Sequence, residues 1–107
     1  MPSKAVRAGS SVYNTFEAII PGTQENLAFI NAGSAASAAF ATGVTAIRIV
    51  SDVDCYIQIA AAPTAASTTA FLPAKTPEIF GVSANDKIAA RGVSGSGTLF
   101  ITQGATP

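Results

Sequence analysis

The chain has 107 residues, enough for one small domain, and its six Lys and Arg balance six Asp and Glu to a formal net charge of +0. Only 11% of the residues are charged, which argues against the basic surface that nucleic-acid-binding proteins use to neutralise phosphates. A hydrophobic content of 49% argues against an acidic disordered tail. With one Cys and no His, neither an intrachain disulfide nor a Cys/His zinc site can form.

The apolar residues are of the kind that favours strands. The chain has ten Ile and seven Val against three Leu, and β-branched side chains suit the pleated surface of a sheet. The 22 Ala would favour helix by themselves, but they lie among Ser, Thr and Gly, which favour turns or loosen the backbone. No apolar run is long enough for a signal peptide or a membrane span, so we expect synthesis in the cytoplasm.

The N-terminal residues are small, polar and basic, with Lys4 and Arg7 as the cations. We expect residues 1–11 to form an extended arm and residues 12–107 to fold as a single β-sandwich domain. A terminus of this composition also frays without any role in many proteins, and the sequence leaves that alternative open.

Two strands are predicted in the first third of the chain. Residues 12–20 alternate loosely and are expected to end at the Pro-Gly turn signal of residues 21–22. Residues 25–31 follow, with Leu27 and Phe29 on the same face.

The clearest strands lie in the middle of the chain, after an ambiguous segment. Residues 34–41 are small except for Phe40, and their pattern fits a helical turn as well as an edge strand. Residues 45–50 and 53–59 alternate between apolar and polar side chains, and the short polar link between them predicts an antiparallel hairpin. The side chains expected to point inward are Ile47, Ile49, Val53, Cys55, Ile57 and Ile59.

The remaining residues predict four further short strands separated by turns. These strands are residues 68–72, 78–82, 87–93 and 98–103. Asn and Asp in residues 83–86 predict a turn, and the Ser-Gly-Ser-Gly run of residues 94–97 predicts a hairpin loop. Seven or eight short antiparallel strands without an amphipathic helix predict an all-β fold, a small jelly-roll-like β-sandwich, although an immunoglobulin-like sandwich fits the same pattern.

Each candidate for chemistry has a stronger structural interpretation. Asp52 and Asp54 lie close in sequence, but calcium needs six to eight oxygens, usually from a longer acidic loop, so a turn is favoured. Cys55 lies on an apolar face with no His to act as its base, and a neighbouring carboxylate disfavours its thiolate. The Gly-rich run of residues 94–97 lacks the following helix that phosphate cradles use.

The carboxylates outside that segment do not form the pair that glycoside cleavage requires. They are isolated from one another in the sequence, at Glu17, Glu25 and Glu78. We therefore expect a protein that is not an enzyme, with no catalytic, cofactor-binding or metal-binding residue.

The second half of the chain resembles a group of small tailed-bacteriophage virion proteins that includes capsid decoration, or cement, proteins. The resemblance covers about residues 44–103 and rests on the order of short motifs along the chain. The motifs are Ala46-Ile47-Arg48-Ile49-Val50, Asp54-Cys55-Tyr56-Ile57-Gln58-Ile59, Pro63-Thr64-Ala65, Phe71-Leu72-Pro73-Ala74, Pro77-Glu78-Ile79-Phe80, Asp86-Lys87-Ile88-Ala89 and Gly97-Thr98-Leu99-Phe100-Ile101-Thr102. Asn85 departs from the pattern, since the group prefers Gly at that turn.

The resemblance implies a structural virion protein that binds the outer surface of a phage capsid and bridges major capsid protein subunits. Its expected partners are the major capsid protein and further copies of itself, as a homotrimer rather than a dimer, with no nucleic acid, membrane or cofactor. The candidate residues for capsid or subunit contact are Lys4, Arg7, Tyr13 and Phe16.

Two alternatives to a decoration protein stay open at this point. The first is a tail, neck or fibre component of the same virion, which differs in copy number rather than in sequence pattern. The second is a soluble carbohydrate-recognition module, which has less support because the chain has no Trp and only two Tyr.

Overall fold

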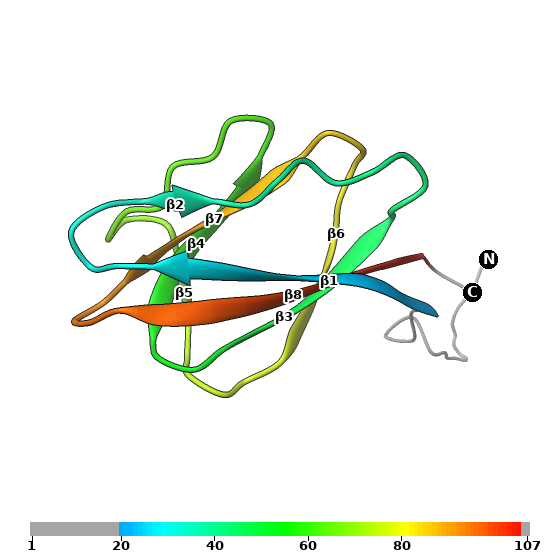
Figure 1. Ribbon diagram of the computed structural model, residues 1–107. Helices are drawn as coiled ribbons and strands as arrows, with labels where there is room; N and C mark the ends of the chain where they lie inside the picture. The colour runs from blue at the N-terminus through cyan, green and yellow to red at the C-terminus, as the bar shows by residue number, and fades with distance from the viewer. Residues whose placement is uncertain (1–19, 106–107) are drawn as a thin grey trace, which may run out of the picture.

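The structure is a computed structural model that describes residues 20–105. The described chain is all-β and forms two four-stranded antiparallel sheets that pack face to face (Figure 1). The strands are β1 (Ile20–Phe29), β2 (Ala35–Ala36), β3 (Ala46–Ser51), β4 (Cys55–Ala60), β5 (Ala70–Leu72), β6 (Glu78–Gly81), β7 (Lys87–Gly92) and β8 (Gly97–Ala105). The predicted β-sandwich is confirmed.

The strand order is that of a jelly roll. The first sheet has the order β1-β8-β3-β6 and the second has the order β2-β7-β4-β5. The pairs β1 with β8, β2 with β7, β3 with β6 and β4 with β5 are nested inside one another, and all are antiparallel. Such nesting winds one long double-stranded ribbon around a core, which is how eight strands make a jelly roll.

Both hairpins predicted from the second half of the chain are wrong. β3 pairs with β6 and β8, whereas β4 pairs with β5 and β7, so the link of residues 52–54 crosses from one sheet to the other. The Ser-Gly-Ser-Gly loop likewise joins β7 of the second sheet to β8 of the first. Alternation identifies the side chains that face the core, but both sheets face the same core, so the pattern does not say which sheet a strand joins.

The predicted strand end at residues 21–22 is also wrong, because β1 continues through the Pro-Gly signal. Pro21 faces Gly104 and Gln24 faces Thr102, so β1 has one residue more than β8 over this stretch. This extra residue is a β-bulge, and β1 is an edge strand, which are the two places where a sheet tolerates proline. The rest of the predicted strand, residues 12–19, lies outside the described residues.

The ambiguous segment of residues 34–41 is an edge strand rather than a helical turn. It contributes the two-residue strand β2 and then a loop whose one large side chain, Phe40, is only 1% exposed. The backbone of Phe40 donates a hydrogen bond to the Asp86 carbonyl (2.8 Å) and accepts one from the Asn85 amide (3.0 Å). These two bonds hold the loop against the β6–β7 turn and direct the phenyl ring into the core.

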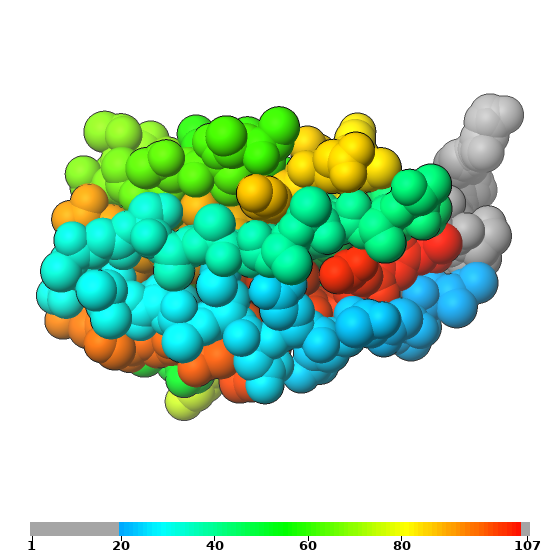
Figure 2. Space-filling model, turned by 45° about the horizontal axis from the view of Figure 1, so that its top comes forward, coloured from blue at the N-terminus to red at the C-terminus, as the bar shows by residue number. Residues whose placement is uncertain are grey.

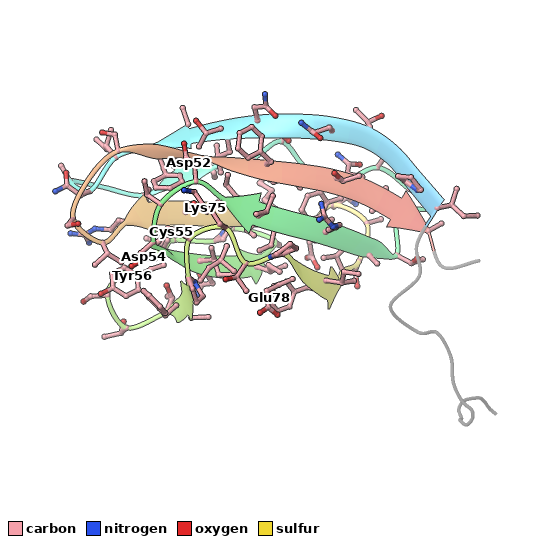
Figure 3. All side chains as sticks on the ribbon, turned by 90° about the horizontal axis from the view of Figure 1, so that it is seen from below. Asp52, Asp54, Cys55, Tyr56, Lys75 and Glu78 are labelled. Carbon is pink, nitrogen blue, oxygen red and sulfur yellow. The ribbon has the colours of Figure 1, made fainter. Side chains whose placement is uncertain are left out.

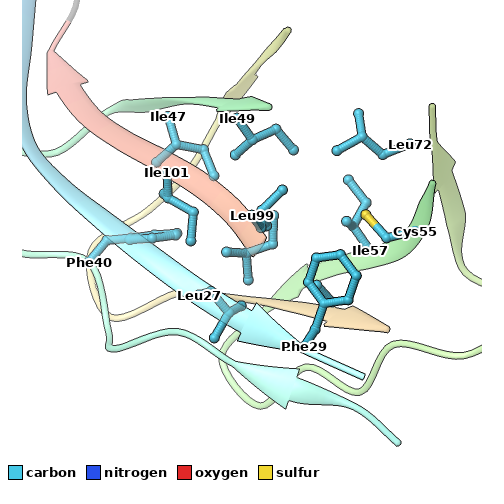
Figure 4. Packing of buried hydrophobic residues seen from close by; sticks show 12 residues of the cluster. Leu27, Phe29, Phe40, Ile47, Ile49, Cys55, Ile57, Leu72, Leu99 and Ile101 are labelled. Carbon is cyan, nitrogen blue, oxygen red and sulfur yellow. The ribbon is translucent and has the colours of Figure 1, made fainter. Parts of the chain in front are cut away.

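The core lies between the two sheets and has the predicted faces (Figure 4). Ile47 and Ile49 of the first sheet are fully buried, and Ile57 of the second sheet is 3% exposed. The cluster consists of Leu27, Phe29, Phe40, Ile47, Ile49, Cys55, Ile57, Leu72, Ile88, Ala90, Leu99 and Ile101. Its Ile side chains all lie on strands, and its two Phe rings come from the end of β1 and from the loop before β3.

Candidate functional site

The residues predicted to contact a capsid or another subunit lie outside the described residues. They are Lys4, Arg7, Tyr13 and Phe16. Their roles therefore stay predictions, as does the boundary between the arm and the domain.

Asp52 and Asp54 of the β3–β4 crossover, which are labelled in Figure 3, accept hydrogen bonds from backbone amides. A carboxylate oxygen of Asp52 accepts a hydrogen bond from the Thr98 amide at 2.8 Å, and one of Asp54 accepts from the Ala74 amide at 2.8 Å. The first bond ties the crossover to β8, and the second ties it to the β5–β6 turn. Within residues 20–105, no group of three or more His, Cys, Asp or Glu is placed to hold a metal ion.

Cys55 is a fully buried member of the core. Burial raises the pKa of its thiol, the nearby Ser51 hydroxyl lowers it, and the charges of Asp54 and Asp52 raise it further. Because the thiolate is the reactive form of cysteine, the raised pKa keeps the group in its unreactive neutral state. The side chain thus acts as a small apolar residue.

Two aromatic side chains, the exposed Phe71 and the half-buried Tyr56, lie on the outer face of the second sheet. Tyr56 of β4 faces Phe71 of β5 on one side and Arg91 of β7 on the other. The rings of Tyr56 and Phe71 meet edge to face, with centroids 6.1 Å apart and planes inclined by 63°. Their chain neighbours Cys55 and Leu72 are buried, so the alternation of each strand turns the two rings outward.

Two further exposed apolar side chains, Ile30 and Val93, belong to segments whose backbones bond to the end of β7 and to the residue before β4. The Val93 amide donates to the Asp54 carbonyl at 3.2 Å, and the Gly92 amide donates to the Ile30 carbonyl at 2.9 Å. Phe71 and Ile30 are each 53% exposed and Val93 is 40% exposed. We refer to the following four residues as the apolar patch: Ile30, Tyr56, Phe71 and Val93.

A cation borders the apolar patch. The Nε of Arg91 donates a hydrogen bond to the Asn31 carbonyl at 3.2 Å, and the Arg91 backbone is the cross-strand neighbour of Tyr56. Tyr and Arg are enriched among the residues that dominate protein–protein binding energy. The arrangement is suited to burying apolar surface against another protein while Arg91 bonds a polar group at the rim.

Sequence reasoning found the outward direction of Tyr56 but missed the patch. Its members come from the segment after β1, from β4, from β5 and from the segment after β7. The available signal was a Tyr on the polar face of an alternating strand and a Phe before Leu-Pro. Neither indicates the other, because the register between two strands brings them together.

Comparison with known proteins gave no match: no family model, no curated protein and no solved structure is similar to this chain. The fold and the apolar patch define a small jelly-roll domain with exposed apolar side chains on its surface. No helix long and apolar enough to cross a membrane occurs among residues 20–105.

Proposed function

We propose that this protein is a non-enzymatic structural component of a phage virion that binds the outer surface of the capsid and stabilises it by bridging major capsid protein subunits. Two things support the proposal: the motif resemblance over residues 44–103 and the apolar patch on the second sheet. The apolar patch is the observation that carries it, because Phe71, Tyr56 and Arg91, on neighbouring strands of one sheet face, are residue types enriched at protein-binding surfaces.

The sheet edges favour contact through a face rather than by strand addition. β1 carries Pro21 and the bulge, β2 has two residues, β5 has three and precedes Pro73, and β6 follows Pro77. Short strands, prolines and bulges are the means by which edges resist pairing with other chains. A partner would therefore meet this domain through an outer sheet face, where the apolar patch lies.

Assembly multiplies the contribution of each patch. Complete burial of one large apolar side chain contributes about 1.5–3 kcal/mol, so a patch of this size supports a weak contact by itself. A homo-oligomer that presents several copies converts later contacts into intramolecular ones and gains avidity of about 10²–10⁴. A trimer bridging several capsid subunits would stabilise the shell in this way.

The test is the copy number of the protein in virions of the phage that encodes it, measured by quantitative mass spectrometry against the major capsid protein. Hundreds of copies per particle would support a shell decoration protein. A handful would place it in the tail, neck or fibre instead, and complete absence from the particle would overturn the proposal.

A matched pair of substitutions tests the patch itself. We expect Phe71→Ala to weaken binding to capsids lacking the protein by at least about tenfold, which corresponds to about 1.4 kcal/mol. Phe100→Ala is the control, since Phe100 lies on the first sheet, paired with Val50 and Asn26, and does not belong to the core cluster. Equal weakening by both substitutions would contradict a specific role for the patch.

A further inference from the structure

A groove opens at the end of the sandwich opposite the β7–β8 loop. It has a volume of about 340 Å³ and lies between the start of β1, the end of β8 and the loop before β3. Figure 2 shows the end of β8 in the hollow between that loop and β1. The groove therefore lies where the chain enters the described part of the molecule, at Ile20.

The groove is lined mainly by small and apolar residues, with Thr23 and Gln103 as its polar members. Ala41, Gly43, Gly104 and Ala105 line it, so the backbone is open to close approach by another chain. Ile20 stands at its rim and is 60% exposed, the largest exposed fraction among the large apolar side chains described. The amide of Thr45 donates to the Gly104 carbonyl at 3.1 Å, which fixes the loop to β8 and keeps the groove formed.

The occupant is suggested by the chain that precedes Ile20. Nineteen residues lie before it, and residues 12–19 include Val12, Tyr13 and Phe16, which are large and apolar or aromatic. An extended segment spans about 3.3 Å per residue, so an extended arm would carry Phe16 about 13 Å and Tyr13 about 23 Å from Ile20. This is far enough to enter a neighbouring molecule.

Docking in the groove of the same molecule is disfavoured by the sequence. Residues 16–19 contain no Gly, Pro, Asn, Asp or Ser, which are the residues that dominate tight turns. The nearest such residue is Asn14, and a reversal there would return residues 7–9, Arg-Ala-Gly, to the groove. Those residues carry no aromatic side chain, so a tight reversal within one molecule does not bring Tyr13 and Phe16 to the groove, whereas the segment of a neighbouring copy can do so.

We propose that the groove binds residues 12–16 of the N-terminal segment of a second copy of this chain, with Tyr13 and Phe16 as the anchoring side chains. This goes beyond the proposed function, because it concerns assembly of the protein in solution without a capsid. The contact is head-to-tail, and such contacts close into rings when the rotation between copies allows it. A ring of three is the simplest assembly consistent with the expected homotrimer.

Disulfide trapping between separately purified variants, each with one introduced cysteine, tests the proposal. Thr15→Cys protein is mixed with Ala41→Cys protein, or with Ser96→Cys protein as the control, and oxidised. Ser96 is exposed and lies at the other end of β8 from the groove. The native Cys55 is buried and does not compete. Mixed dimers are identified by mass.

With each protein at about 10 μM, an arm held in the groove gives an effective concentration of about 1 mM, so the Ala41→Cys mixture should cross-link about 100-fold faster than the control. Adding Phe16→Ser to the Thr15→Cys protein should reduce that rate to the control level. Equal rates for the two mixtures would overturn the proposal, as would an exclusively intrachain disulfide in the Thr15→Cys/Ala41→Cys double variant. A rate unaffected by Phe16→Ser would overturn the assignment of the anchor.

Discussion

Replacing Phe40 by Ala should destabilise the domain more than replacing a Phe whose ring lies on the surface. The ring is 1% exposed and is the one large side chain that residues 34–41 place in the core. The loop backbone is held independently by hydrogen bonds of 2.8 Å to Asp86 and 3.0 Å from Asn85. Because those bonds remain in the variant, the loop cannot collapse fully into the space that the ring vacates.

The expected loss follows from burial and the cavity left behind. Truncating a buried Phe to Ala costs about 3–5 kcal/mol, and the rigid backbone places this site toward the upper end of that range. A domain of this size has a total stability of about 5–15 kcal/mol, so the variant should retain only part of it. Phe71→Ala is the matched control: its ring is 53% exposed, and losing the edge-to-face contact with Tyr56 should cost about 1 kcal/mol.

Urea unfolding followed by far-ultraviolet circular dichroism measures both losses. Circular dichroism is preferred to fluorescence because Phe71 touches Tyr56, and the chain has no Trp. The dependence of the unfolding free energy on urea should be unchanged, so the difference appears as a lower midpoint. Equal losses from the two variants would refute the placement of Phe40 in the core, since its burial predicts a difference of at least about 2 kcal/mol.

Two further predictions concern β4. Ile57→Asp removes about 1.5–3 kcal/mol of apolar burial and adds several kcal/mol of carboxylate desolvation, so this variant should not fold. Gln58→Asp loses the 2.8 Å hydrogen bond from the Thr64 amide, so it should fold with a loss of about 1 kcal/mol in stability. Circular dichroism of both variants checks this, and equal damage would mean that the faces of β4 are exchanged. Because burial raises the pKa of the Cys55 thiol, ionisation favours the unfolded chain. The contribution of the thiol to stability is therefore complete below about pH 8.5, the ordinary thiol pKa, and is lost as the pH rises toward the raised folded value. Unfolding free energies of the native protein and of Cys55→Ala, measured from pH 7 to 10, should converge as the pH rises, and parallel curves would contradict the buried neutral thiol.

Much of the fold follows from local pattern. The alternation of residues 45–50 and 53–59 correctly predicts the buried faces, because side chains along a strand point in opposite directions in turn. The turn of residues 83–86 is also predictable: Asn85 has a φ of 72°, and a carboxylate oxygen of Asp86 accepts a hydrogen bond from the Ser83 amide at 3.1 Å. Asn tolerates that backbone region and Asp closes such turns, so the sequence carries both signals.

Other features depend on the packing of the two sheets. A short polar link between alternating strands serves equally as a hairpin turn and as a crossover between sheets, and residues 52–54 prove to be a crossover. The crossover passes close to the start of β8, where a Cβ at Gly97 would lie 2.6 Å from the Asp52 carboxylate. The tight approach suits Gly there, but a Gly in a Ser-Gly-Ser-Gly loop has no distinctive pattern in the sequence.

The sequence by itself determined the class of fold, the inward faces of the strands and the outward direction of Tyr56, because each depends on a few neighbouring residues. The tertiary structure decided which strands pair, and with them the apolar patch and the groove. Tyr56, Phe71 and Arg91 become neighbours only through the register of three strands. That register is set by non-local hydrogen bonds and by the shared core, and neither leaves a pattern within any one segment of the chain.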